Sequence, residues 1–210
     1  MNPWTPDTLR IWNKLTQPAL NRAGEALSNL TAQPVRLEGI GTRTVAWPEL
    51  ENKIHLDHPD RDPVYATHLG AFGLFPADIL LVFSEAAAAG LLAVLTGEPE
   101  KQPFELDEMA VSALAEVGNI IGTAFLNVFA DTFQQPWEPT PPRVTVGPFA
   151  RLVAEVFPHW KPQDQVLLSE AVFRVGDSVM EGYLVVVPRP WSEAPQAVAK
   201  EGSRGEGIGG

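Results

Sequence analysis

The 210-residue chain has no cysteine, which excludes disulfide bonds and thiolate metal sites. Basic residues are also scarce: 15 lysines and arginines stand against 26 aspartates and glutamates, a formal net charge of −11. Nucleic acid and anionic lipid both attract basic surfaces, so this composition argues against general affinity for either. We therefore expect no nucleic acid and no membrane among the partners, and a basic group on whatever the protein binds.

Long hydrophobic runs are missing as well. The most apolar stretches, 79–83 and 86–95, are separated by Ser84 and Glu85, and both fall short of the ~20 residues that a membrane span needs. Residues 1–10 show no basic region followed by an apolar run, so no signal peptide is predicted. A hydrophobic fraction of 45% is that of ordinary globular domains, so we expect a folded chain with its own core. Without a predicted membrane span we expect a soluble protein, and the absence of cysteine fits the reducing cytoplasm.

The hydrophobic pattern alternates between helix-like and strand-like segments. Two long segments, 7–30 and 106–131, carry apolar residues at steps of three and four and are predicted helices. Pro18 lies inside the first and should kink it. Shorter helices are predicted at 85–95 and 149–156. The predicted strands are 34–37, 64–72, 79–83, 144–146, 166–175 and 179–187. This mixture predicts an α+β fold.

Two segments are predicted to be irregular. Residues 189–210 are rich in glycine, serine, proline and charge, which favours a disordered tail. Residues 49–62 read as a polar loop containing a dense run of potential metal ligands: His55, Asp57, His58, Asp60 and Asp62. Two histidines and a carboxylate can hold zinc. However, no helical register makes these side chains converge, so we expect a solvated loop and no metal.

Matching residues recur at a constant spacing of 103. Gly73 and Gly176 differ by that number, as do Leu81 and Leu184, and the same shift lays the first long helix over the second. One shift that aligns a helix and two strands indicates an internal duplication. We predict a single domain, 1–188, made of pseudo-repeats at about 7–98 and 105–188. The two copies are expected to pack their sheet faces together, with the helices outside.

A polar stripe runs along the second long helix. Ser112, Glu116, Asn119 and Thr123 follow one another at steps of four, three and four, which places them on one side of a helix. A carboxylate can hold a cation, and an amide one turn away can orient a water molecule, because it both donates and accepts hydrogen bonds. The ordinary interpretation, the solvated side of an amphipathic helix, remains open.

The first copy does not repeat this pair. A shift of 103 takes Glu116 and Asn119 to Asn13 and Thr16, which offer neither the carboxylate nor the amide at the required place. We therefore expect these first-repeat equivalents to be inactive. One site is predicted, on the second long helix.

Three segments together resemble the CheC-type chemotaxis phosphatases, with their CheX and FliY relatives. They are Glu-Leu-Asp-Glu at 105–108, Ser-Ala-Leu-Ala-Glu-Val-Gly-Asn at 112–119 and Ala-Phe-Leu-Asn at 124–127. The family shares a helical motif, Asp/Ser-x3-Glu-x2-Asn, whose positions are held here by Ser112, Glu116 and Asn119. The resemblance extends from about 7 to 188. It implies an internally duplicated CheC-like α+β fold, with long helices packed on β-sheet.

The resemblance also implies an activity, the hydrolysis of the aspartyl phosphate of a CheY-like response regulator. Glu116 would pair with the lysine beside the phosphorylated aspartate, and Asn119 would orient a water for in-line attack, with Ser112 as the supporting motif position. Positioning and charge neutralisation are the main needs of phosphoryl transfer. No cofactor of the protein itself is implied, since the Mg²⁺ would belong to the regulator.

Two further functions stay open. The degenerate first copy favours a binding module that holds the response regulator, or a CheD-type deamidase, without turnover. A structural role in a motor switch is the other, since rotor proteins share the fold without the Glu/Asn pair. The lifetime of the regulator's phosphate distinguishes the enzyme from both.

Overall fold

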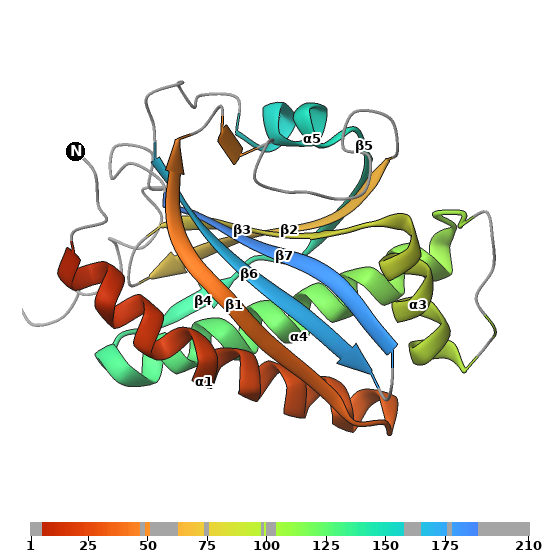
Figure 1. Ribbon diagram of the computed structural model, residues 1–210, viewed down its shortest axis with the longest axis horizontal. Helices are drawn as coiled ribbons and strands as arrows, with labels where there is room; N and C mark the ends of the chain where they lie inside the picture. Colours follow the sequence, from red (N-terminus) through yellow and green to blue (C-terminus); the bar gives the residue numbers. More distant parts are fainter. Residues whose placement is uncertain are drawn as a thin grey trace, which may run out of the picture.

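The computed structural model describes residues 6–46, 49–50, 63–73, 76–97, 99, 104–157, 165–175 and 178–188. Two 26-residue helices, α1 (Pro6–Thr31) and α4 (Glu108–Phe133), run along one side of a β-sheet (Figure 1). Helix α1 continues through Pro18 without interruption. Helix α4 begins where the Asp107 carboxylate accepts a hydrogen bond from the Ala110 N–H, and it ends at Gln134 in the left-handed conformation.

The remaining elements follow the predicted order. The shorter helices are α3 (Glu85–Thr96) and α5 (Phe149–Val156). The strands are β1 (Val35–Ala46), β2 (Val64–Gly73), β3 (Ala77–Phe83), β4 (Trp137–Pro139), β5 (Arg143–Gly147), β6 (Gln165–Val175) and β7 (Ser178–Pro188). Strand β1 is three times the predicted length because it pairs with β6 from end to end. The α+β class is confirmed.

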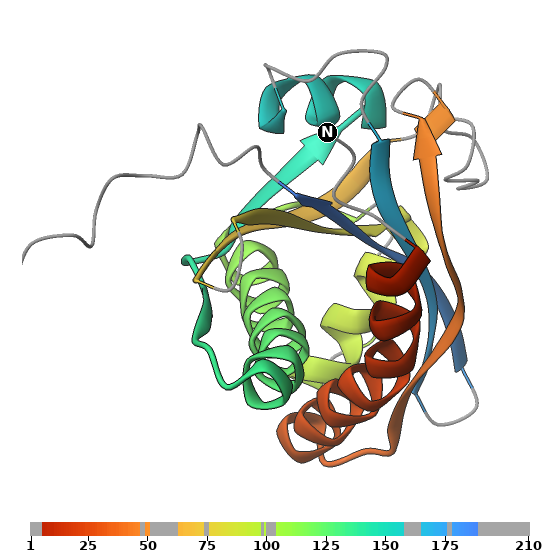
Figure 2. The same ribbon diagram turned by 90° about the vertical axis from the view of Figure 1, so that its left-hand side faces the viewer.

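All seven strands form one antiparallel sheet, in the order β1-β6-β7-β3-β2-β4, with β5 also pairing with β2. The expectation of two sheets packed face to face is therefore wrong. The copies join edge to edge, through hydrogen bonds between β3 and β7. Helices α1, α3 and α4 cover one side of this sheet and α5 lies on the other (Figure 2).

The sheet has pseudo-two-fold symmetry. From the central pair β3 and β7, the next strands outward are the equivalents β2 and β6, followed by β5 and β1. Leu81 and Leu184, which the repeat makes equivalent, face each other across the central pair. The first strand of each half therefore pairs with the hairpin of the other half. Each copy completes the sheet of its neighbour.

The spacing that relates the two long helices in the structure differs from the predicted spacing of 103. Seven residues of α1 are buried: Trp12, Thr16, Ala19, Leu20, Ala23, Gly24 and Leu27. A shift of 102 takes each of them to a buried residue of α4, whereas a shift of 103 does so for only two, Ala19 and Ala23. The bounds of α1, 6–31, also become 108–133 under a shift of 102. Equivalent positions in α1 and α4 are therefore 102 residues apart.

The extra residue enters at the hairpin turn. Ala71 of β2 pairs with Ala77 of β3, six residues further along the chain, whereas its equivalent Phe173 of β6 pairs with Met180 of β7, seven residues further along. The shift of 102 therefore holds through β2 and becomes 103 in β3, where the matching residues were first found. A one-residue error in a strand also exchanges its two sides. Tyr65 packs on the helix side of the sheet, as does Leu167, whereas Leu168 packs on the α5 side.

The larger core lies between the sheet and the long helices. Trp12 of α1 stands 5.4 Å and 4.6 Å, ring centre to ring centre, from Phe125 and Phe129 of α4, and Trp137 closes the cluster. By length and composition alone α4 is apolar enough to cross a membrane, but one such helix is weak evidence for a span, and half of its most apolar window is buried within the fold.

Several predictions fall outside the described residues. The potential ligand run at 55–62 and the tail 189–210 both do. The boundaries of the pseudo-repeats remain predictions. Within the part of the chain that the structure describes, no cluster of three or more His, Cys, Asp or Glu side chains could hold a metal ion.

Candidate functional site

Glycines seat the middle of α4 directly on β2. A Cβ added at Gly118 would lie 2.3 Å from Cγ2 of Thr67, and one at Gly122 would lie 3.1 Å from Cδ2 of Leu69. The Thr67 hydroxyl donates a hydrogen bond to the Leu114 carbonyl, 3.2 Å away. Contacts this close leave room for backbone and hydrogen only. They fix the inward side of α4, and hence the side that points outward.

The start of α4 is held by a second set of contacts. The hydroxyl of Tyr65 donates to the carbonyl of Phe104, and the carboxylate of Glu85 accepts from the Phe104 N–H. The two rings meet edge to face at 4.9 Å. Burial, and after it the nearby Glu85 carboxylate, raises the pKa of Tyr65 above its usual value. The segment that leads into α4 is thus anchored on β2 and α3.

The predicted site residues lie on the side of α4 that points away from the sheet. Ser112 and Glu116 are exposed and Asn119 is half-buried. Glu116 and Asn119 lie within one helical turn of each other. Among the residues that the structure describes, none of the three side chains has a hydrogen-bond or ion-pair partner. An open carboxylate and an open amide therefore stand side by side.

The first-repeat equivalents need correction. With the shift of 102, the counterparts of Glu116 and Asn119 are Lys14 and Gln17, not Asn13 and Thr16. Thr16 is a core residue, 7% exposed, and its hydroxyl donates to the Trp12 carbonyl. Asn13 and Thr16 follow from a shift of 103, which holds for β3 and β7 but not for the helices, because the second hairpin has one residue more. The first copy still lacks the Glu/Asn pair.

The Gln17 side chain is engaged in hydrogen bonds within its own half of the molecule. Its side-chain amide donates to the Leu37 carbonyl and to Asn21, and its side-chain carbonyl accepts from the Gly39 N–H. The side chain is thereby tied to β1, whereas Asn119 is not tied in this way. The two pseudo-equivalent positions differ in freedom as well as in chemistry.

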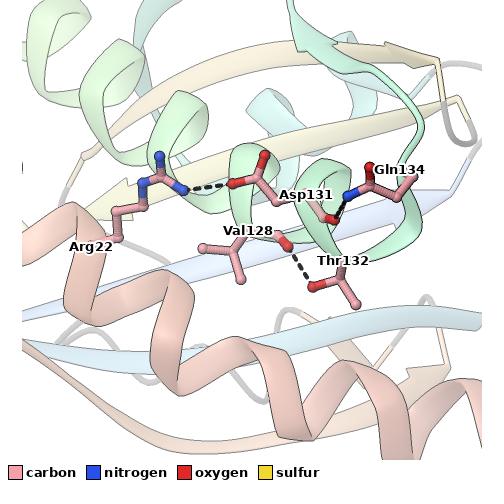
Figure 3. A network of polar contacts seen from close by, with 5 residues as sticks. All are labelled: Arg22, Val128, Asp131, Thr132 and Gln134. Atoms are coloured by element: carbon pink, nitrogen blue, oxygen red, sulfur yellow. Dashed lines mark hydrogen bonds and ion pairs between the residues drawn. The ribbon is translucent and has the colours of Figure 1, made fainter.

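The far end of α4 is joined to α1. Arg22 forms a 3.0 Å ion pair with Asp131, near the C-terminal turn where Gln134 and Thr132 bond to backbone carbonyls (Figure 3). Both partners of the ion pair are exposed, so it contributes at most about 1 kcal/mol. It lies more than three turns beyond Glu116 along α4 and leaves that face open.

Sequence reasoning missed two exposed apolar residues near the polar stripe. Val111 has the spacing of a buried apolar residue of α4 but is 37% exposed, and Met109 is 54% exposed. A signal existed for Met109, which precedes Glu116 by two turns and so lies on the same side of the helix. No such signal existed for Val111, because its spacing from Leu114 and Gly118 is that of a buried residue.

One further polar pair lies on the opposite side of the sheet. Nε2 of His68 on β2 is 2.7 Å from Oδ1 of Asp78 on β3, and the aspartate side chain is almost fully buried. The histidine ring also packs at 6.4 Å from Phe157, which follows α5. This pair is separated from Glu116 by the sheet and does not belong to the same site.

The fold is that of the CheC-like proteins, a class that includes FliY, CheX and the middle domain of FliM. No family model matches the sequence. The structure of Thermotoga maritima FliY is similar over 89% of this chain and 92% of that chain, with a TM-score of 0.72 and 14% identity. The FliM middle domain from H. pylori covers 88% and 94%, with a TM-score of 0.67 and 10% identity.

A complex is also among the similar structures. The CheX–CheY–BeF3–Mg²⁺ complex from Borrelia burgdorferi matches 82% of this chain and 96% of that chain, with a TM-score of 0.52 and 18% identity. At identities this low, these structural similarities establish the shared fold and no more. They confirm the predicted CheC-like architecture.

Proposed function

We propose that the protein is a phosphatase that hydrolyses the aspartyl phosphate of a CheY-like response regulator, in the cytoplasm, within a chemotaxis or motility pathway. The observation that carries this proposal is the pair of open side chains, Glu116 and Asn119, one turn apart on the outward side of α4. A solved structure of the same fold, CheX, is in complex with CheY, which supports a partner of this class.

The proposed reaction needs two contributions from this chain. The Glu116 carboxylate binds the lysine beside the regulator's phosphorylated aspartate and so anchors α4 beside the phosphate. The Asn119 amide holds a water in line with the bond to be broken. The water oxygen attacks phosphorus and the bond from phosphorus to the aspartyl oxygen breaks. The regulator's aspartate carboxylate is regenerated and inorganic phosphate leaves, with the water protons passing to phosphate and solvent. The Mg²⁺ belongs to the regulator.

This arrangement matches what phosphoryl transfer requires. The transition state carries most of its charge on the phosphoryl oxygens, so positioning and electrostatics provide the rate enhancement. No covalent intermediate on this protein is needed. An amide that is half-buried keeps fewer rotamers than a fully exposed one, so less ordering is required when the partner docks.

The test is the decay of phosphate from a purified, phosphorylated CheY-like regulator. The parent protein should accelerate decay, and Asn119→Ala should lose about 100-fold of that acceleration, the usual effect of removing one positioning hydrogen-bond group. Asn127→Ala is the matched control, because Asn127 is a half-buried asparagine two turns further along the same helix. It should leave decay unchanged. If Asn119→Ala is as active as the parent, the assigned role of that residue is wrong.

The second candidate is a binding module for a regulator, a CheD-type deamidase or a motor component. Its support is that FliM domains of this fold are found in complexes with FliG and with SpeE in H. pylori. Binding of the phosphorylated regulator with an unchanged phosphate lifetime would favour the module. Co-fractionation with a flagellar motor complex would favour a switch component.

A further inference from the structure

We propose that His68, Arg143 and Thr145 form a phosphate-binding site on the side of the sheet that carries α5. The ligand is a phosphate group that keeps at least one P–OH, either free inorganic phosphate or a phosphate monoester. The sheet lies between this site and the outward side of α4, so the site is independent of the proposed function. These three residues are called the β2–β5 site.

Strand pairing brings the three residues together. His68 of β2 lies directly opposite Arg143 of β5, and Thr145 lies opposite Ala66, two positions further along the same ladder. Directly opposite residues of an antiparallel pair project to the same side with Cβ atoms about 5 Å apart, and diagonal neighbours stand about 7–8 Å apart. One phosphate group can therefore reach all three side chains.

The shared side is the one that α5 covers. Ala66, which lies between Thr145 and His68 on this side, belongs to the same apolar cluster as Phe149 and Leu152 of α5. The His68 ring packs at 6.4 Å from Phe157, at the end of that helix. Its side chain is still 21% exposed. The imidazole is thus held in place and remains within reach of a small ligand.

A buried carboxylate fixes the imidazole. Nε2 of His68 is 2.7 Å from Oδ1 of Asp78, whose side chain is 4% exposed. An ionised carboxylate only accepts hydrogen bonds, so in neutral imidazole the proton lies on Nε2 and Nδ1 is an acceptor. Among the residues that the structure describes, Nδ1 has no hydrogen-bond partner. The histidine therefore offers an oriented acceptor to a ligand.

Arg143 and Thr145 add unused donors. The Arg143 side chain is exposed and has no hydrogen-bond or ion-pair partner in the described part of the chain. The Thr145 hydroxyl is buried and lacks a partner there as well. A buried hydroxyl without a hydrogen bond is uncommon, because it costs free energy. Both groups would gain from acceptor oxygens on a ligand.

The combination of groups selects the ligand. A guanidinium binds two anionic oxygens at once through its fork of N–H donors, whereas Nδ1 of His68 requires a donor. Hydrogen phosphate supplies both, because its P–OH can donate to Nδ1 while its anionic oxygens accept from Arg143 and Thr145. Carboxylates and sulfate carry no hydroxyl group near neutral pH. A metal ion would be repelled by the guanidinium.

The experiment follows the imidazole NMR signals of His68 in the full-length protein, identified by their loss in His68→Gln. At constant pH and ionic strength, inorganic phosphate should shift them along a saturating curve, with half-saturation on the order of 1 mM for a few partly exposed hydrogen bonds. Sulfate should bind at least tenfold more weakly, because it cannot donate to Nδ1.

Methyl phosphate identifies the source of the phosphate group. Saturable binding comparable to that of inorganic phosphate supports the site and points to a phosphate monoester. Binding of inorganic phosphate alone supports the site and points to the free anion.

Variants assign the contacts. Arg143→Gln should weaken phosphate binding at least tenfold, and Thr145→Val about threefold, since hydrogen bonds to charged groups are the stronger ones. Arg143→Lys should fall between the parent and Arg143→Gln, because it keeps the charge and loses the fork. Arg36→Gln is the matched control: Arg36 is an exposed arginine on β1, at the opposite edge of the sheet, and has no partner among the described residues. It should leave phosphate binding unchanged.

Three results would overturn the proposal. They are a shift that grows linearly with phosphate and never saturates, sulfate binding as tight as phosphate binding, and parent-like phosphate binding by Arg143→Gln. Urea midpoints verify that each variant is folded. If Arg143→Gln does not fold, Thr145→Val decides in its place, because this change preserves the shape of the side chain and removes a hydroxyl that has no partner within the described structure; parent-like phosphate binding by that variant would then overturn the site.

Discussion

Replacing Gly118 with alanine tests how closely α4 approaches β2. The new Cβ would lie 2.3 Å from Cγ2 of Thr67, about 0.7 Å inside the 3.0 Å limit that real Cβ contacts respect. Thr67 cannot turn away easily, because it is fully buried and its hydroxyl is bonded to the Leu114 carbonyl. Either the strand or the helix must therefore move.

The magnitude follows from two opposing effects. Alanine is a better helix former than glycine by about 1 kcal/mol. Overpacking a closed core position costs about 1–3 kcal/mol, and a clash this short belongs at the upper end. We expect Gly118→Ala to lower the free energy of unfolding by about 2 kcal/mol. Any outward movement of α4 would also displace Glu116 and Asn119, which flank the glycine.

Thr67→Ser makes the test specific, because it removes only the Cγ2 atom and keeps the hydroxyl that bonds to Leu114. In that background Gly118→Ala should be neutral or stabilising, which is non-additivity of the kind that contacting residues show. Urea unfolding of the four proteins, with unchanged m-values, measures this cycle. Gly41→Ala is the control, since nothing lies within 4 Å of its added Cβ.

The reasoning would be refuted if Gly118→Ala stabilised the protein equally in both backgrounds. Alanine would then be acting only through helix propensity, and α4 would not be seated on β2 through this contact. The contact with Thr67 would then not set the position of Glu116 and Asn119.

Two further predictions concern stability and assembly. The pKa of Tyr65 is raised by burial and then by Glu85. The unfolded chain therefore ionises first, and stability should fall as the pH rises past about 10. Tyr65→Phe should flatten that decline in urea midpoints, and a slope identical to that of the parent would contradict the assignment. Fragments 1–103 and 104–210 should each fail to fold as monomers, because β1 pairs with β6 and β5 pairs with β2 across the two halves. Mixing the two fragments should restore native circular dichroism. Cooperative unfolding of either monomeric fragment would be evidence against this interlocked topology.

Much of the secondary structure could be read from local patterns. Helix α4 was predicted at 106–131 and is found at 108–133, because its apolar stripe and its Asp107 cap are local features. Most of β1 could not be found. Its residues 38–46 include Gly39, Gly41 and charged side chains, and they form a strand because β6 supplies hydrogen bonds along the whole length.

The repeat was visible in the sequence, but its exact spacing was not. Apolar strand residues match at several shifts, and the best matches lay in β3 and β7, beyond the one residue by which the second hairpin is longer than the first. Only the burial of α1 against α4 gives the shift of 102. That shift decides that Lys14 and Gln17, and not Asn13 and Thr16, are the counterparts of the candidate pair.

By itself the sequence determined that a carboxylate and an amide stand one turn apart on a helix, because helical periodicity depends only on spacing. The tertiary structure decided which way they point. The close approach of Gly118 to Thr67 and the packing of Phe125 on Trp12 bury the other side of α4, so Glu116 and Asn119 are left facing outward, with Met109 and Val111 exposed beside them. Packing between distant segments sets that orientation, and no local pattern encodes it.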